Sequence, residues 1–490
     1  MKRMTGILFI AILAGLVFSP IQPAKASPTH TSIWSSSIVV YNPSDTDTTE
    51  YNIVYYGSDD PNNVIPSSLR TLIPHESVSI LVGSTILDED FKGGAVISSD
   101  REVIAIYRQS TPETSMIVYS SFTIDDAGAG KFYIPVARRN AEGYSSRISV
   151  QNLHTAPASV SFQFFSNSGT YSQTITPASN QVYSNASLVF DLASTDFSAL
   201  GDNFIGSVVI TTGGSEKIIA AVQDFAGASS QTYAYQGEAA GDNEVYIPNA
   251  ACSFGRSQLS TELLVQNTGS STLSSFSIEY YDANGTLSGA HSDLSGLNLA
   301  PGDSISVDSC SAIAAGSNYS ALVTSSQQPV SVVVRTTDNS GFAATINGFS
   351  QPGSEWLGSD NKYRMVLPYG EWTRSDNSYQ TYIAVMNASD SAATEVSAVY
   401  FYENGTRAVT HTLASASNPL PVKAKRTTNA NAAPGLLNPQ DQYFKGAVVI
   451  ESNVPIVAVA RVQRTLNNPA GGLITEGDDY GAIPFAKPAD

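Results

Sequence analysis

Hydrophobic and polar residues alternate along most of this chain. The stretch Ile148 to Gln151 is one example, and turn-forming residues separate such stretches roughly every 8 to 14 residues. Strict alternation is typical of strands that bury one face of a sheet, so Ile148 and Val150 should point inward and Ser149 and Gln151 outward. Amphipathic helical windows of 12 or more residues are absent, and only short helical turns are expected, for example at 194–200. The pattern predicts an all-β protein.

One strand motif, apolar-x-Val-x-Asn, occurs four times. Its asparagines follow one another at intervals of 110, 115 and 120 residues. Each is followed by an aromatic pair, an aromatic-x-small strand start and a nearly continuous apolar run, which fits a strand buried on both faces. Each Asn should end its strand by bonding its own backbone, as in an Asx turn. The four are Asn42, Asn152, Asn267 and Asn387.

These four repeats predict four tandem immunoglobulin-like β-sandwich domains. About 116 residues per repeat is the size of one two-sheet sandwich. Four such modules in a row would form a rod of roughly 150 Å if each is about 40 Å long. Its short Gly-containing linkers should allow limited bending. The expected domains are 27–124, 131–236, 244–350 and 363–467, followed by a tail at 468–490.

The first 26 residues have the pattern of a signal peptide. Lys2 and Arg3 precede an apolar run at 6–18, and Ala24-Lys25-Ala26 is a small-x-small cleavage motif. We expect cleavage after Ala26 and a secreted protein. A retained anchor is the alternative, but the run is shorter than the roughly 20 residues that span a bilayer. No membrane span is expected in the mature chain.

The repeats resemble those of bacterial secreted proteins built from tandem immunoglobulin-like β-sandwich modules. This resemblance covers essentially the whole mature chain, and its motifs are core-packing motifs. It implies a cell-surface adhesin, a filament or envelope component, or an accessory module of an exported enzyme. It transfers no functional residue, because no ligand or catalytic motif is recognisable.

An apolar-Pro marker opens each later repeat, at Ile134-Pro135, Ile247-Pro248 and Leu367-Pro368, and it suits an edge strand. The first repeat has no such marker, whereas the chain ends with one at Ile483-Pro484-Phe485. One hypothesis is that this orphan strand completes the first domain of a second copy, giving a head-to-tail filament. The alternatives are that it folds onto the fourth domain or is a disordered terminus.

Composition narrows the class of partner. The formal charge is −18 and only 14% of the residues are charged. Nucleic acids and anionic membranes require a basic face, and the sequence has none. The remaining candidate partners are a second copy of the chain, cell-surface components and glycans.

Cys252 and Cys310 are 58 residues apart in the third repeat. In an oxidising compartment they should form a disulfide, which would contribute on the order of 4 kcal/mol. Two free thiols or a redox pair are the alternatives, although no CxxC spacing is present.

Catalytic and metal motifs are missing from the sequence. There are five histidines, without HExxH, and no GxSxG elbow, so we expect a non-enzymatic protein without a cofactor. The alternative is a glycoside hydrolase, whose two catalytic acids can converge from distant strands without forming a sequence motif. Acidic clusters lie at 59–60, 88–90, 125–126 and 478–479. We expect solvated loops there, with a calcium site as the alternative.

Loops after the apolar-Pro markers combine arginine with aromatic residues. Such loops suit domain-to-domain packing or, alternatively, glycan binding by ring stacking. The candidates are Arg139, Tyr144, Phe254, Arg256, Trp372, Arg374 and Tyr379, with Arg138 beside them. Arg108, Arg335 and Arg461, with Gln223 in the second repeat, are expected to cap strand ends at the surface. The sequence as a whole predicts a secreted structural or adhesive protein, with a carbohydrate-binding array as the alternative.

Overall fold

The expectation of an all-β protein is confirmed. The computed structural model describes residues 8–11 and 35–486, except 59, 83–86, 88–90, 111–115, 124–125, 167–171, 227–231, 292–293, 295, 340–341, 374–377, 438–442 and 468–472. Helix within these residues is limited to short 3₁₀ turns, one of them at the predicted place. They are η3 (Thr195–Leu200), η4 (Ser309–Ser311) and η5 (Ser354–Trp356).

Each repeat contributes two antiparallel sheets, and the third repeat has the simplest arrangement. Its first sheet has the strand order β21-β26-β23-β24, and its second sheet has the order β25-β22-β27-β28. The strands are β21 (Glu244–Cys252), β22 (Ser260–Asn267), β23 (Ser277–Tyr281), β24 (Leu287–His291), β25 (Ser304–Asp308), β26 (Ser317–Thr324), β27 (Val330–Thr337) and β28 (Ala343–Asn347).

The second and fourth repeats keep this order. In the second, the sheets are β12-β18-β14-β15 and β17-β13-β19-β20, and β11 and β16 add short edges. In the fourth, they are β29-β34-β31-β32 and β33-β30-β35-β36, joined by one β29–β30 pair. The strands of the second repeat are β11 (Gly128–Ala129), β12 (Lys131–Arg139), β13 (Tyr144–Asn152), β14 (Ala158–Ser166), β15 (Ser172–Ile175), β16 (Gln181–Val182), β17 (Ser187–Asp191), β18 (Phe204–Thr212), β19 (Lys217–Ala226) and β20 (Thr232–Gln236). Those of the fourth are β29 (Tyr363–Trp372), β30 (Ser378–Asn387), β31 (Val396–Tyr402), β32 (Arg407–Ala414), β33 (Lys425–Asn429), β34 (Phe444–Ser452), β35 (Ile456–Asn467), β36 (Leu473–Gly481) and β37 (Ile483–Phe485).

The first repeat has the same two sheets, with one unusual strand. The second sheet is β6-β2-β8-β9, and the first is β10-β1-β7-β3-β4 with β5 paired to β3. Strand β1 pairs with β7 where β12 pairs with β18 in the second repeat. The predicted leader therefore supplies the strand that the first repeat otherwise lacks. The strands are β1 (Leu8–Ala11), β2 (Ser35–Tyr41), β3 (Thr49–Gly57), β4 (Val64–Pro66), β5 (Arg70–Leu72), β6 (Ser77–Leu81), β7 (Gly93–Ser99), β8 (Ile104–Ser110), β9 (Met116–Ser120) and β10 (Phe122–Thr123).

The repeated asparagines end their strands as predicted, and each also holds a distant loop. Asn267 is fully buried, and its Oδ1 accepts the backbone N–H of Gly269 at 3.0 Å. Its Nδ2 donates to the carbonyls of Ser271 and Leu299, at 2.8 and 2.9 Å. Asn42, Asn152 and Asn387 repeat both kinds of bond.

The prolines of the apolar-Pro markers lie at β-bulges. The pairing register shifts between Ile134 and Ala137, between Ile247 and Ala250, and between Leu367 and Gly370. A bulge tolerates a residue that cannot donate a ladder hydrogen bond. Strands β12 and β21 lie at sheet edges, as the marker predicted.

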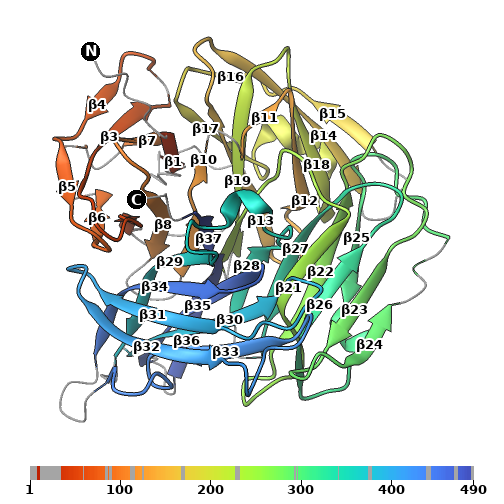
Figure 1. Cartoon of the computed structure of the whole chain (residues 1–490). Helices are drawn as coiled ribbons and strands as arrows, with labels where there is room; N and C mark the ends of the chain where they lie inside the picture. The colour runs from red at the N-terminus through yellow and green to blue at the C-terminus, as the bar shows by residue number, and fades with distance from the viewer. Residues whose placement is uncertain are drawn as a thin grey trace.

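The repeats form a closed ring, so the expected linear rod is wrong (Figure 1). Strands β9, β20, β28 and β36, here called the axial strands, are each the outer strand of a second sheet. Around a common axis, β9 contacts β20 and β36, while β28 contacts the same two strands. Each first sheet also packs on the second sheet of the next repeat, as β12 does on β22 and β27, and β29 does on β2 and β8.

Ring packing buries the faces that alternation had assigned to solvent. Ser149 and Gln151 are 2% and 0% exposed, although both are polar and lie opposite the core face of β13. The neighbouring repeat covers this face, because strands β17 and β7 are in contact. The outward assignment of these residues is therefore wrong.

The C-terminal strand is not an orphan in this structure. Strand β37 pairs antiparallel with β29 of the same repeat, with Ile483 opposite Val366, Pro484 opposite Met365 and Phe485 opposite Arg364. The segments after β20 and β28 form matching single bridges with β12 and β21, at Glu238 and Phe349. Because β37 follows the last axial strand in the same way, it corresponds to a linker and not to the opening strand of a further repeat.

Cys252 and Cys310 form the expected disulfide, with their Cα atoms 4.9 Å apart. Cys252 ends β21 in the first sheet of the third repeat, and Cys310 lies in η4 after β25 of the second sheet. The bond therefore links the two sheets of the third repeat.

Candidate functional site

The four repeats meet most closely along the axis. One residue of each axial strand lies opposite an equivalent residue of the neighbouring strand in the same sheet. The residues on these neighbouring strands are Arg108, Gln223, Arg335 and Arg461. The residues on the axial strands, here called the equivalent axial residues, are Val118, Ala234, Thr345 and Asp479. Since an axial strand has a ladder partner on one side only, its N–H groups on the other side point to the axis and need acceptors.

Asp478 supplies those acceptors. Its Oδ1 accepts the N–H groups of Thr345 and Asp479, both at 2.9 Å. Its Oδ2 accepts those of Val118 at 3.2 Å and Ala234 at 3.3 Å. One fully buried carboxyl thus bonds an equivalent backbone donor from every repeat. Burial raises the pKa of Asp478 well above its usual range, and these backbone donors oppose that shift.

Two residues after each equivalent axial residue, polar side chains link the axial strands by hydrogen bonds. Gln236 Nε2 donates to the carbonyl of Ser120 at 2.7 Å, and Asn347 Nδ2 donates to that of Gln236 at 2.7 Å. Ser120 Oγ donates to the carbonyl of Gly481 at 2.9 Å. Gly481 has no side chain, so the fourth repeat makes no equivalent side-chain hydrogen bond to the third repeat at this position.

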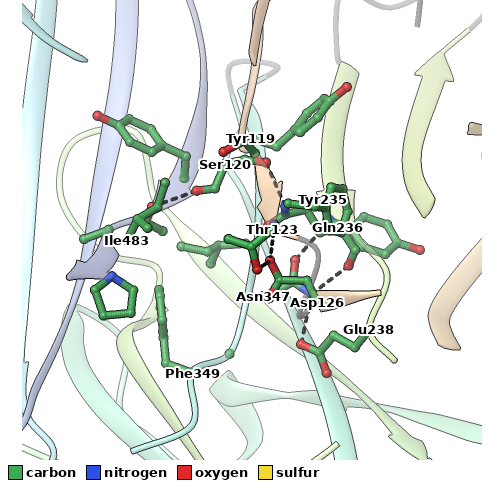
Figure 2. Close-up of a pocket in the computed structure, with 18 of the residues that line it drawn as sticks. Tyr119, Ser120, Thr123, Asp126, Tyr235, Gln236, Glu238, Asn347, Phe349 and Ile483 are labelled. Atoms are coloured by element: carbon green, nitrogen blue, oxygen red, sulfur yellow. Dashed lines mark hydrogen bonds between the residues drawn. The ribbon is translucent and has the colours of Figure 1, made fainter. Parts of the chain in front are cut away.

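A cavity of about 1040 Å³ opens beyond this polar layer (Figure 2). Ser120, Gln236, Asn347 and Gly481, one residue from each repeat, line it. Aromatic side chains supply much of the remaining lining: Tyr119, Phe122, Tyr235, Phe349, Trp356 and Tyr480. A cavity of this size can hold a ligand of several rings.

The cavity is acidic. Glu102, Asp126, Glu238 and Asp479 line it, and the described lining contains no lysine, arginine or histidine. Burial raises the pKa of Glu102 and of Glu238 to about 7 in each case. Glu238 accepts a hydrogen bond from Asn347 at 3.1 Å, whereas Asp479 is neutralised by a bidentate pair with Arg461 at 2.7 Å.

This arrangement supports binding better than covalent chemistry. The Ser120 hydroxyl donates to a carbonyl, the Thr123 hydroxyl donates to Asp126 at 2.9 Å, and no histidine or cysteine lies in the described lining. No group of three or more metal-ligating side chains occurs among the residues that the structure describes.

The predicted arginine-aromatic loops of the second and fourth repeats lie at packed positions. Arg138 donates to Asp224 at 2.6 Å and to Tyr233 at 2.7 Å, and Tyr144 packs against Tyr233 with ring centroids 5.3 Å apart. Arg139 pairs with Asp202 at 2.5 Å.

In the fourth repeat, Trp372 is only 6% exposed. Tyr379 accepts from Arg108 of the first repeat at 3.2 Å. A glycan could not stack on Trp372 without displacing neighbours. Phe254 and Arg256 of the third repeat stay exposed, and Arg374 lies outside the described residues.

The arginines on the strands beside the axial strands do not cap strand ends at the surface, as the sequence suggested. Each reaches the preceding repeat around the ring. Arg108 crosses to Tyr369 at 2.9 Å, Arg335 approaches Glu142 at 3.7 Å, and Arg461 lies 5.0 Å above the ring of Phe342. Gln223 donates to Gln109 of the first repeat at 3.3 Å.

Sequence reasoning missed Asp478, which was assigned to a solvated acidic loop. It lies inside β36 and is fully buried, so that assignment is wrong. Its position along the chain could have identified it as part of a strand. Leu473–Gly481 follows the last apolar run, at the place where an axial strand occurs in the other repeats. Of the other acidic clusters, Asp59, 88–90 and Asp125 lie outside the described residues.

No family model matches this chain, and no curated protein matches it. Among solved structures, the crystal structure of a tetra-tandem repeat in the extending region of a large adhesion protein is similar at 10% identity, over 90% of this chain and 93% of that chain. Its TM-score is 0.10, which carries no argument about fold or function. Within the described residues, no helix is long and apolar enough to span a membrane.

Proposed function

We propose that this chain is a secreted, non-enzymatic binding protein with a structural or adhesive role at the cell surface or in the extracellular matrix. In this proposal each repeat is an immunoglobulin-like sandwich domain and the axial cavity is the binding site. The observation that carries it is convergence: side chains from all four repeats line one cavity, and the described lining contains no histidine or cysteine.

Two further features support this proposal. The disulfide between Cys252 and Cys310 suits an oxidising, extracellular compartment. The leader pattern that ends at Ala26 suits export. A filament built through β37 is not part of the proposal, because β37 would first have to leave β29.

The test starts with the full chain expressed in a secreting bacterial host. We expect the product outside the cytoplasm, with Ser27 as its first residue. Beads coated with the purified protein should then be retained on bacterial cells or on a polysaccharide matrix, and beads coated with the heat-unfolded protein should not. Retention in the cytoplasm, equal retention of both bead types, or hydrolysis of the matrix would each contradict the proposal.

A further inference from the structure

The axial cavity holds carboxyl groups that have no positive partner. Glu102 precedes β8, and Glu238 follows β20, so two different repeats supply them. Neither forms an ion pair with any residue that the structure describes, although Asp479, which also lines the cavity, does. Burying a carboxylate without a cation is unfavourable, and a bound cation would remove this cost.

The remaining lining suits an apolar body attached to such a cation. Phe349 and Tyr119 lie on opposite sides of the group of polar side chains in Figure 2. Trp356 also lines the cavity. Aromatic faces attract ammonium and guanidinium groups and cover hydrocarbon surface.

The Ser121 hydroxyl is a further polar group that a ligand could bond. Ser121 lines the cavity and is 8% exposed, and its buried hydroxyl has no hydrogen-bond partner among the residues that the structure describes. Buried hydroxyls in proteins are nearly always bonded. A ligand in the cavity with a hydrogen-bond acceptor or donor next to Ser121 would satisfy this hydroxyl.

We propose that the axial cavity binds a small organic ammonium ion with an apolar body, held by Glu102 and Glu238 and covered by the aromatic lining. This inference rests on the proposed function and names its ligand class. A neutral saccharide would also use the aromatic side chains and the amides of Gln236 and Asn347, but it would leave both carboxyls without a cation.

The probe is 2-phenylethylamine, with its neutral N-acetyl derivative as the matched control ligand, titrated into the full chain by calorimetry at pH 8. We expect the amine to bind and the derivative to bind at least about tenfold more weakly, the effect of one hydrogen-bonded charge. Tryptophan fluorescence should change on binding, because Trp356 lines the cavity.

The variants are Glu102→Gln and Glu238→Gln, each of which keeps an oxygen acceptor and removes the charge. Each should weaken amine binding about tenfold, and the exposed control Glu50→Gln should not change it. Unchanged folding of every variant is checked by its melting temperature.

The pH dependence gives a second readout. Amine binding should strengthen from pH 6 to pH 8, because Glu102 and Glu238 lose their protons near pH 7 while the amine stays protonated. Asp126 and Asp242 are the other carboxyls near them, and Asp479 is already paired with Arg461. The nearby tyrosines stay neutral in this range, since burial raises the pKa of Tyr119, Tyr235 and Tyr480.

Equal binding of the amine and its derivative, or unchanged binding in both Gln variants, would overturn the inference. Binding of cellotriose that is lost in Trp356→Ala would also overturn it and would make the cavity a glycan site. Neither result would affect the bead-retention test, so the proposed function and its ligand class can fail separately.

Discussion

At the scale of single residues, Asp478 has the largest number of structural consequences. It bonds the backbone of every repeat at one point, and no other side chain replaces it there. A buried N–H without an acceptor costs about 1 to 3 kcal/mol, and the carboxylate satisfies several at once. The ring is therefore stabilised where its axial strands have no ladder partner.

Asp478→Asn should destabilise the protein by about 2 to 4 kcal/mol. The amide keeps one oxygen but turns its NH₂ group toward two backbone donors, so either Val118 and Ala234 or Thr345 and Asp479 lose their acceptor. Denaturant unfolding measures the change, with Asp196→Asn on the exposed turn η3 as the control. An unfolding free energy equal to that of the control would contradict the role given to Asp478.

Lys425 is a second buried ionisable group with a measurable effect. It lies in β33 of the fourth repeat and donates to Asn249 at 3.0 Å and to the carbonyl of Tyr319 at 2.9 Å, both in the third repeat. Asn318 accepts its third hydrogen bond. No carboxylate is among these partners, and burial, with Arg461 nearby, lowers the pKa of Lys425 well below 10.5.

This lowered pKa makes stability depend on pH. Between the folded-state pKa and the unfolded value near 10.5, the unfolded chain binds the extra proton, so stability rises with pH in this window. Within this window each added pH unit should stabilise the wild type by up to about 1.4 kcal/mol relative to Lys425→Met. Denaturant unfolding at a series of pH values below 10.5 measures this difference, and Lys131→Met, at an exposed site, should behave like the wild type. Parallel pH dependence in wild type and Lys425→Met would refute the assignment.

Residues that stabilise a single repeat could be predicted from the sequence, whereas residues that join different repeats could not. Asn267 recurs with fixed neighbours, and its Asx turn follows from local chemistry. Asp478 has no counterpart in the other repeats, because a single carboxylate serves all of them. Glu102 and Glu238 are far apart in sequence, and packing of the first repeat on the second brings both to one cavity.

At the scale of elements, the strands were predictable and their neighbours were not. Alternation identified the core side of β13, but it could not indicate that a neighbouring repeat covers the other side. The apolar-Pro motif identified edge strands β12 and β21 correctly. The same motif was misleading in β37, because pairing with β29 depends on position after an axial strand and not on the motif itself.

Strand β1 leads to a prediction about the first repeat. It lies between β7 and β10, yet it belongs to the predicted leader. Removal of residues 1–26 would leave the edge of β7 unpaired, so its amides should exchange faster in the mature chain than in the full chain. Hydrogen exchange read by mass spectrometry compares the two forms, with β18 of the second repeat as the internal control. Equal protection of β7 in both forms would mean that another segment pairs with it.

At the scale of the whole molecule, closure requires the fourth repeat to contact the first as each repeat contacts the next. Arg108 bonds Tyr369 and Tyr379, at 2.9 and 3.2 Å. His75 stacks on Phe401 with ring centroids 4.0 Å apart. Four repeats in chain order can thus bury both faces of their second sheets, which a linear array would leave partly in water.

The ring and the linear array differ in size, and small-angle X-ray scattering distinguishes them. A compact chain of this length should have a radius of gyration of about 23 Å. A rod of roughly 150 Å would exceed about 40 Å. We expect the compact value for the full chain and, because β37 pairs in cis, discrete particles in negative-stain images. Deleting residues 481–490 removes β37 and uncovers an edge of β29, so this variant should melt at a lower temperature and keep the compact radius. An extended radius for the full chain, or fibres that disappear with the deletion, would refute the closed ring and restore a head-to-tail connector.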